Sequence, residues 1–123
     1  MIRFITIGGN DLKRAIIFYY SLTSLLDAKV IMENNRMKIY WSIWGKGSIA
    51  ICNLKNLETA SAGNGNMIAI NLDLSEDVAI VYSYNLELGA IDYGKPGKRS
   101  STFYGAYAKD LDNNKLCFYS RSI

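Results

Sequence analysis

The sequence predicts an α+β fold of two βαβββ modules, whose curved mixed sheets surround a cleft and carry their helices on the outer faces. Three observations predict it. Short apolar strands accompany one amphipathic helix in each half of the chain. The pattern of the first half recurs in the second at a spacing of 63 residues, so that Phe4–Ile7 falls on Met67–Ile70. A turn rich in Asp and Asn, Asp110–Asn114, joins two strands near the end.

The first module places one helix after its first strand. Asn10 or Asp11 is expected to cap this helix through a side-chain oxygen. Apolar residues then recur at three- and four-residue steps, which indicates one buried helix face: Leu12, Ala15, Ile16, Tyr19, Leu22 and Leu26. The expected strands are residues 3–8, 28–32, 37–44 and 48–53, and the last two form a hairpin around Gly45–Gly47.

The second module repeats this order after an irregular linker over residues 54–66. The expected elements are a strand over 67–72, a helix that Ser75 caps and Gly89 ends, a strand over 90–93, and a hairpin of 101–109 with 115–119. Gly94–Gly97 is interpreted as a surface turn rather than an anion cradle, because no helix N-terminus follows it. We therefore expect one domain, residues 1–123, with modules over about 1–53 and 67–123.

Composition excludes several classes of function. Half of the 123 residues are hydrophobic and 20% are charged, as in ordinary globular proteins. The net charge of +3 and the lack of a long Lys/Arg run argue against a nucleic-acid partner. No apolar run approaches the roughly 20 residues of a membrane span, and no signal-peptide core follows Met1. Cys52 and Cys117 are expected to be buried free thiols, which favours a reducing, cytoplasmic location.

Three segments resemble the glyoxalase, bleomycin-resistance and extradiol-dioxygenase superfamily, the vicinal oxygen chelate proteins. Ile5–Tyr19 (ITIGGNDLKRAIIFY) is similar to the family's first strand with its N-D-L-x-R-A and F-Y pattern. Gly63–Ile70 (GNGNMIAI) resembles the start of the second repeat. Gly94–Phe118 resembles the end of the second module, where a D-P-D-G-N-K-hydrophobic-E pattern is typical. The resemblance covers nearly the whole chain and implies a glyoxalase-like branch whose members mostly lack an assigned reaction.

The resemblance also implies where a metal would be held. In catalytic members His and Glu side chains bind a divalent ion that polarises two substrate oxygens. The positions fall on residues that lack such donors: Phe4, Ala50, Met67 and Cys117. The chain contains no histidine at all. We therefore expect no metal and no other cofactor in the cleft.

Cys117 and the aromatic residues are the remaining candidates. Cys117 has no histidine to activate it as a nucleophile, so inert packing is favoured over catalysis. If Asp110–Asn114 is a five-residue loop, Tyr107 faces Cys117, and alternation places Phe103 on the same side. In the first module Trp41 shares a face with Ile39 and Ile43, which we assign to the cleft. These rings either line a pocket or fill the space as core.

The predicted ligand-binding residues are Phe4, Trp41, Ala50, Met67, Phe103, Tyr107 and Cys117. The function expected from them is that of a metal-free protein, a homodimer, that holds or sequesters a flat apolar or cationic small molecule. One alternative is an enzyme of the superfamily, a lyase or oxidoreductase, that acts without the usual metal site. A filled cleft kept for protein–protein contact is another.

Overall fold

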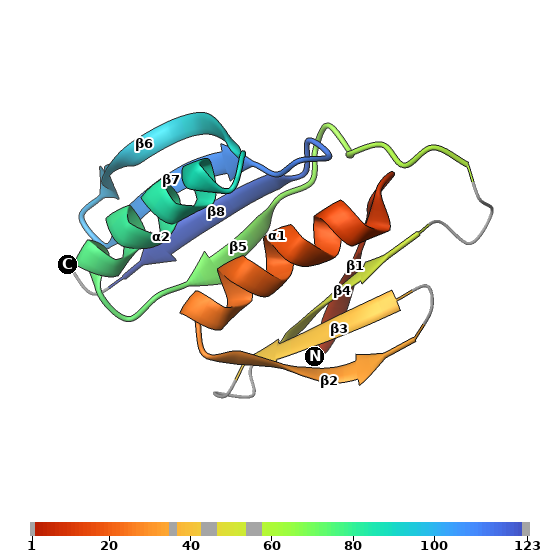
Figure 1. The fold of residues 1–123 in the computed structure, drawn as a ribbon. Coiled ribbons are helices and arrows are strands. Elements are labelled where there is room, and N and C mark those ends of the chain that lie inside the picture. Colours follow the sequence, from red (N-terminus) through yellow and green to blue (C-terminus); the bar gives the residue numbers. More distant parts are fainter. Residues whose placement is uncertain (1, 35–36, 43–46, 54–57, 122–123) are drawn as a thin grey trace. The chain divides into compact units, whose positions relative to one another are not determined.

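The computed structural model describes residues 2–34, 37–42, 47–53 and 58–121, and for residues 37–42 it describes the backbone alone. The chain divides into two compact units, Met1–Ser61 and Ala62–Ile123. In each unit one helix lies across one face of a four-stranded mixed sheet (Figure 1). The order of elements is βαβββ in both units, so the predicted α+β fold is confirmed. No helix in the described part of the chain has the length and apolar character needed to cross a membrane.

The first unit contains β1 (Phe4–Gly8), α1 (Leu12–Leu25), β2 (Ala28–Glu33), β3 (Met37–Ser42) and β4 (Ser48–Cys52). The sheet order is β1-β4-β3-β2, with β1 parallel to β4 and the other pairs antiparallel. Asp11 caps α1 as predicted, because its carboxylate accepts the Arg14 N–H at 3.0 Å. The turn predicted around Gly45–Gly47 falls mostly outside the described residues.

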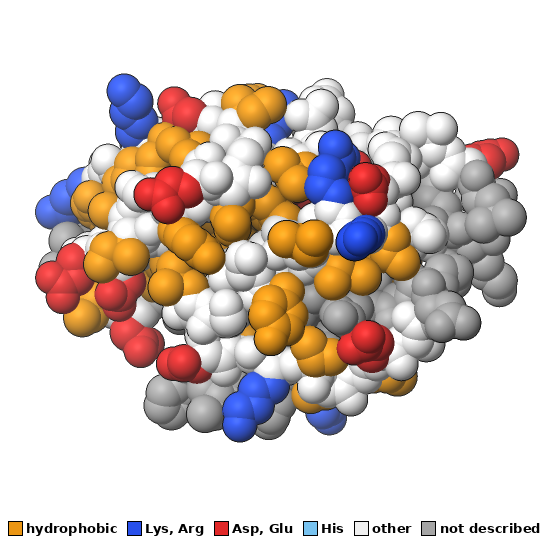
Figure 2. All heavy atoms as spheres, in the orientation of Figure 1, with side chains coloured by type: hydrophobic (Ala, Val, Ile, Leu, Met, Phe, Trp, Pro, Cys, Tyr) orange, Lys and Arg blue, Asp and Glu red, His pale blue; other side chains and the backbone are white. Residues whose placement is uncertain are grey.

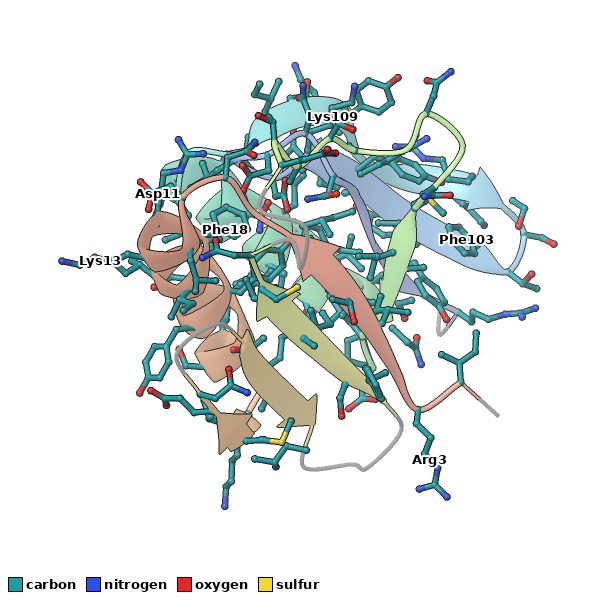
Figure 3. All side chains as sticks on the ribbon, turned by 90° about the vertical axis from the view of Figure 1, so that its right-hand side faces the viewer. Arg3, Asp11, Lys13, Phe18, Phe103 and Lys109 are labelled. Atoms are coloured by element: carbon teal, nitrogen blue, oxygen red, sulfur yellow. The ribbon has the colours of Figure 1, made fainter. Side chains whose placement is uncertain are left out.

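The buried face of α1 agrees with the predicted periodicity at three of its six positions, whereas Leu12, Ile16 and Leu26 are only partly buried. Ala15, Tyr19 and Leu22 are buried as expected. Phe18 is buried as well, although the predicted stripe omitted it (Figure 3). Its ring meets that of Tyr19 edge to face, with centroids 5.0 Å apart, so neighbouring aromatic residues widen the apolar face.

The second unit contains β5 (Ile68–Asn71), α2 (Ser75–Glu87), β6 (Ile91–Ser100), β7 (Phe103–Lys109) and β8 (Lys115–Ser120). Its sheet order, β5-β8-β7-β6, repeats that of the first unit, and β5 is again parallel to its neighbour. The helices begin at Leu12 and Ser75, which are 63 positions apart. The spacing seen in the sequence is therefore the spacing of the structural repeat.

The prediction that Ser75 caps α2 is wrong. Leu74 occupies the N-cap position without a side-chain cap bond, and Ser75 is the first residue of the helix. Glu76 and Asp77 in the first turn complement the positive end of the helix dipole instead. The predicted end is right, since Gly89 follows the helix with a left-handed φ of +104°.

The predicted strand over residues 90–93 is too short. β6 continues to Ser100, and the interpretation of Gly94–Gly97 as a surface turn is wrong. The segment stays in the sheet because register shifts on either side of Gly94 accommodate its irregular backbone. Pro96 is tolerated because β6 is an edge strand, where one side of the backbone has no ladder to break. The longer strand brings Arg99 into the sheet.

One carboxylate organises the turn between β7 and β8. Asp110 is 3% exposed. Its Oδ1 accepts the N–H groups of Asp112 at 2.9 Å and Asn114 at 2.8 Å, and its Oδ2 accepts the Asn114 side-chain amide at 2.9 Å. Asn113 adopts a left-handed φ of 70°, which asparagine tolerates. The Asp and Asn cluster thus acts through the backbone bonds that the sequence predicted.

This turn fixes the register of the last hairpin. Lys109 pairs with Lys115, and Tyr107 pairs with Cys117. The register predicted from a five-residue loop is confirmed. A slip of one residue would send every side chain of β8 to the other face of the sheet.

We expect Asp110→Ala to lower the free energy of unfolding by about 1.5–3 kcal/mol, because several N–H donors lose a charged acceptor. Urea unfolding measures the change. Asp110→Asn is the matched variant, which keeps one acceptor oxygen and should fall between the two. An Ala variant as stable as the wild type contradicts the role assigned to this carboxylate.

A second polar contact ties α2 to β6. The Tyr82 hydroxyl donates to Oδ1 of Asp92 at 2.7 Å, and the same oxygen accepts the Gly94 N–H at 2.9 Å. Burial, followed by the hydrogen bond to Asp92 and the charge of that carboxylate, raises the pKa of Tyr82 to about 12. The bonds from Tyr82 and Gly94 lower the pKa of Asp92.

The raised pKa makes this contact sensitive to alkali. The folded chain holds the Tyr82 proton more tightly than the unfolded chain, so the stabilisation is complete below pH 10.0 and is lost as pH rises toward about 12. We expect the stability advantage of the wild type over Tyr82→Phe to shrink across this range in denaturant unfolding. Tyr84→Phe removes a tyrosine from the same helix as a control. An advantage that stays constant to pH 12 contradicts the assignment.

Candidate functional site

The two faces of the second sheet differ in what lies on them. Tyr82 of α2 bonds to Asp92, whose register partner is Ala108, so Ala108 lies on the face toward α2. Alternation turns the adjacent residues of β7 and β8 to the opposite face, which we call the distal face. The distal face carries Phe103, Gly105, Tyr107, Lys109, Lys115, Cys117 and Tyr119. Phe103 and Lys109 lie at the two ends of β7 (Figure 3).

Tyr107 and Cys117 lie side by side on the distal face, as predicted. Burial raises the pKa of the Cys117 thiol. A side-chain hydrogen bond with Tyr107 and the charges of Lys115 and Arg99 offset part of that rise without reversing it. Cys117 is therefore a neutral, fully buried thiol near neutral pH. This state favours the packing role over the nucleophile.

Gly94 allows the Tyr107 ring to lie close to β6. A Cβ atom at Gly94 would be 2.8 Å from Cδ2 of Tyr107 and 3.5 Å from Nη2 of Arg99. Gly94 also has a φ of +152°, which side chains rarely adopt. The glycine therefore makes room for the ring, while the guanidinium group lies at ordinary contact distance.

Three basic side chains lie over two tyrosine rings at this end of the sheet. Arg99 Cζ and Lys115 Nζ each lie 5.4 Å from the centroid of the Tyr107 ring. Lys115 also lies 5.1 Å from the ring centroid of Tyr93, and Lys109 Nζ lies 4.4 Å from it. These are cation–π distances. The arrangement forms a cluster of alternating rings and positive charges, which we call the cation–tyrosine cluster.

Phe103 belongs to a second aromatic group on the same face. Its ring stacks on that of Tyr119, with centroids 4.9 Å apart and planes 5° from parallel. Gly105 lies beneath, since a Cβ there would be 2.8 Å from Cε1 of Phe103. Both rings are partly exposed, so they are neither full core nor free surface. Pocket lining and core filling therefore both stay predictions for this pair.

The register relates the predicted positions of the two units. Thr6 pairs with Ala50 in the first sheet, and Ala69 pairs with Cys117 in the second. Ala50 and Cys117 are therefore equivalent positions of the repeat. Both are completely buried.

The other predicted residues are more exposed or lie beyond the described side chains. Phe4 begins β1 and is 55% exposed, and Met67 precedes β5 and is 47% exposed. The backbone of Trp41 pairs with Ser48, but its side chain lies outside the described residues. Of the predicted site, the structure brings together Tyr107 and Cys117, with Phe103 on the same face.

Sequence reasoning missed most of the cation–tyrosine cluster. Arg99 lies beyond the strand predicted over residues 90–93 and the turn predicted over Gly94–Gly97, whereas β6 continues to Ser100. The predicted five-residue loop also implies that Lys109 faces Lys115, as the structure shows, but it does not connect them with Tyr93. A usable signal was present, because the hairpin register alone makes Lys115, two positions from Cys117, a diagonal neighbour of Tyr107 on the same face.

Solved structures share this fold over nearly the full length. A glyoxalase/bleomycin resistance protein from Albidiferax ferrireducens T118 is 27% identical, with a TM-score of 0.88 and 98% of each chain covered. A glyoxalase-related enzyme from Fulvimarina pelagi is 17% identical, with a TM-score of 0.80 over 98% of this chain and 87% of that chain. A glyoxalase/bleomycin resistance protein/dioxygenase family enzyme from Burkholderia phytofirmans PsJN is 17% identical, with a TM-score of 0.78 and 96% of each chain covered.

By its fold, the chain belongs to the glyoxalase/bleomycin-resistance/dioxygenase superfamily. No family model matches the sequence, and no curated protein matches it either. The superfamily assignment therefore depends on the three-dimensional repeat and on the segments that resemble the family.

The superfamily's divalent metal does not fit the residues of this chain. At the four positions that the resemblance assigns to the metal ligands, the side chains of Phe4 and Ala50 carry no donor atom, Met67 offers a thioether, and Cys117 is a buried neutral thiol. Iron, nickel and zinc sites of this type need imidazole and carboxylate donors. In the described part of the chain, no three His, Cys, Asp or Glu side chains gather as a metal site would require.

Proposed function

We propose that this chain is a metal-free small-molecule-binding protein of the glyoxalase/bleomycin-resistance type, which holds or sequesters a flat, ring-containing ligand. The observation that carries the proposal is the distal face of the second sheet. There Tyr107 and the stacked pair of Phe103 and Tyr119 present partly exposed rings on rigid strands. Aromatic faces contribute about 0.5–1.5 kcal/mol per well-placed ring contact beyond the buried area.

The proposed site extends within the second unit to Met67, which directly precedes β5. Its exposed side chain favours apolar contents, and methionine adapts to ligand shape. The enzyme alternative has less support, because Cys117 is a neutral thiol and the described part of the chain gathers no metal donor set.

We expect Tyr107→Ala to weaken ligand binding by about tenfold while the fold is retained, because one ring contact with its buried area contributes about 1.4 kcal/mol. Thermal-shift screening of flat aromatic compounds identifies ligands, and calorimetry measures their Kd. Tyr104→Ala removes a tyrosine from the opposite face of the same strand and serves as the control. Chelator should not change the affinity.

The outcomes separate the alternatives. Binding that disappears with chelator contradicts the metal-free proposal. Turnover of a bound compound that survives chelation supports the enzyme instead. A screen in which no flat compound binds removes the proposed function and leaves the rings as packing.

We also propose that the chain forms a homodimer in the cytoplasm. Apolar side chains are exposed on edge strands of both sheets, at Phe4 in β1, Met32 in β2 and Ile91 in β6. Figure 2 shows further hydrophobic side chains at the surface among charged ones. Cys52 and Cys117 are buried free thiols, which suits a reducing compartment.

A symmetric pairing through such edges would bury these apolar side chains from water. Light scattering at about tens of micromolar protein should give twice the chain mass, since dimers form by mass action. Met32→Lys places a charge on an edge and should shift the population toward monomer. A wild-type monomer at that concentration contradicts the dimer.

A further inference from the structure

The cation–tyrosine cluster holds more positive charge than the protein around it neutralises. Lys109 and Lys115 are direct register partners, an arrangement in which like charges repel. Arg99 lies on the same Tyr107 ring as Lys115. Within the described residues, these three side chains contact tyrosine rings and the Lys95 carbonyl, and the charges of Arg99 and Lys115 act on the Cys117 thiol. None of their contacts there is to a carboxylate.

Two acidic groups of the same unit, at the start of β6 and at the end of β7, are held by other contacts. Asp92 faces α2, where it accepts hydrogen bonds from Tyr82 and from the Gly94 N–H. Asp110 uses both carboxylate oxygens to hold its own turn. Cys117 cannot act as a counter-ion either, because burial keeps its thiol neutral. The cluster therefore has no internal anion from these groups.

The guanidinium group of Arg99 is positioned but not saturated. Its Nη2 donates to the Lys95 carbonyl at 2.5 Å, which fixes the group beside the Tyr107 ring. An arginine has five N–H donors in a planar fork, so donors remain for a ligand. Gly94 keeps the space beside both groups clear of a side chain.

We propose that this cluster recognises the negative charge of the ligand, and that the ligand is a small planar carboxylate. Its ring lies against the aromatic residues of the distal face, and its carboxylate pairs with Arg99 and Lys115. Arginine and carboxylate match in planar geometry, and such charge-assisted bonds are stronger than neutral ones. A bare inorganic anion would leave the rings unused, and a neutral ring would leave the charges unpaired. A cationic ligand would compete with Arg99 and Lys115 for the Tyr107 ring.

This inference rests on the proposed function, which it makes more specific. The test uses three probes that share a ring and differ in charge: 2-naphthoate, 2-naphthamide and 2-naphthylmethylammonium. We expect the full-length wild type to bind 2-naphthoate at least about tenfold more tightly than 2-naphthamide, a difference of about 1.4 kcal/mol. The ammonium probe should bind most weakly. Raising NaCl from about 0.05 to about 0.5 M should weaken 2-naphthoate binding and leave 2-naphthamide binding unchanged.

Variants then assign the charge to residues. Arg99→Gln and Lys115→Gln should each reduce 2-naphthoate affinity by about tenfold and change 2-naphthamide affinity by less than about twofold. Lys98→Gln is the matched control: Lys98 is exposed on the same strand and pairs with Tyr104, whose side chain is on the opposite face, so it should change neither affinity. Circular dichroism confirms that each variant is folded.

The inference and the proposed function fail in different ways. Equal affinity for 2-naphthoate and 2-naphthamide, or a preference for the ammonium probe, overturns the carboxylate assignment while ring binding still supports the proposed function. If Lys98→Gln abolishes the preference for 2-naphthoate as strongly as Arg99→Gln does, the residue assignment is wrong. If no probe binds, the inference is wrong, and the proposed function fails with it only if the broad screen of flat compounds is also empty. The wild-type probe and salt series decides the charge question even if a variant fails to fold.

Discussion

The hydrogen bonds of the Asp110 carboxylate set the arrangement of the second unit. They hold a five-residue loop between β7 and β8, and the loop sets which residues of the two strands are partners. Because strand side chains alternate with a period of two, that register decides which side chains of β7 and β8 lie on each face of the sheet. Leu116 and Phe118 face α2 and form core, whereas Lys115 and Cys117 face away from it. Moving the loop by one residue would bury lysine against the helix, which is energetically prohibitive.

The parts of the fold that follow from local chemistry were predictable. The repeat, the Asp11 cap, the Gly89 helix end and the hairpin register each depend on a few residues whose backbone preferences are strong. The course of β6 was not predictable, because Gly94 and Pro96 ordinarily end a strand. Pairing with the neighbouring strand β7 keeps both residues in the sheet. Because the predicted strand ended too early, Arg99 and its place in the cation–tyrosine cluster were not predicted either. Tertiary pairing, not local preference, decides such a segment.

The core between the second sheet and α2 explains how this fold can persist without the metal donors. Burial on the α2 side includes Ala106, Ala108, Leu116 and Phe118, all fully buried. None of these positions coincides with a metal-ligand position. The repeat's equivalent positions, Ala50 and Cys117, are instead filled by small uncharged side chains. A buried carboxylate or imidazole left without its ion would cost free energy, so small apolar groups are the stable replacement.

Under the proposals, positive charge reaches the ligand from side chains at the edge of the sheet rather than from an ion at its centre. An ion polarises the oxygens it binds, and this supports chemistry as well as binding. Arg99 and Lys115 offer charge and hydrogen-bond donors without an open coordination site, and Cys117 remains a thiol. Where the paired carboxylate is not itself the reacting group, such a set binds it equally well before and after any bond changes. Uniform binding of that kind lowers a dissociation constant without lowering a reaction barrier, so this chemistry suits a protein that holds its ligand better than one that converts it.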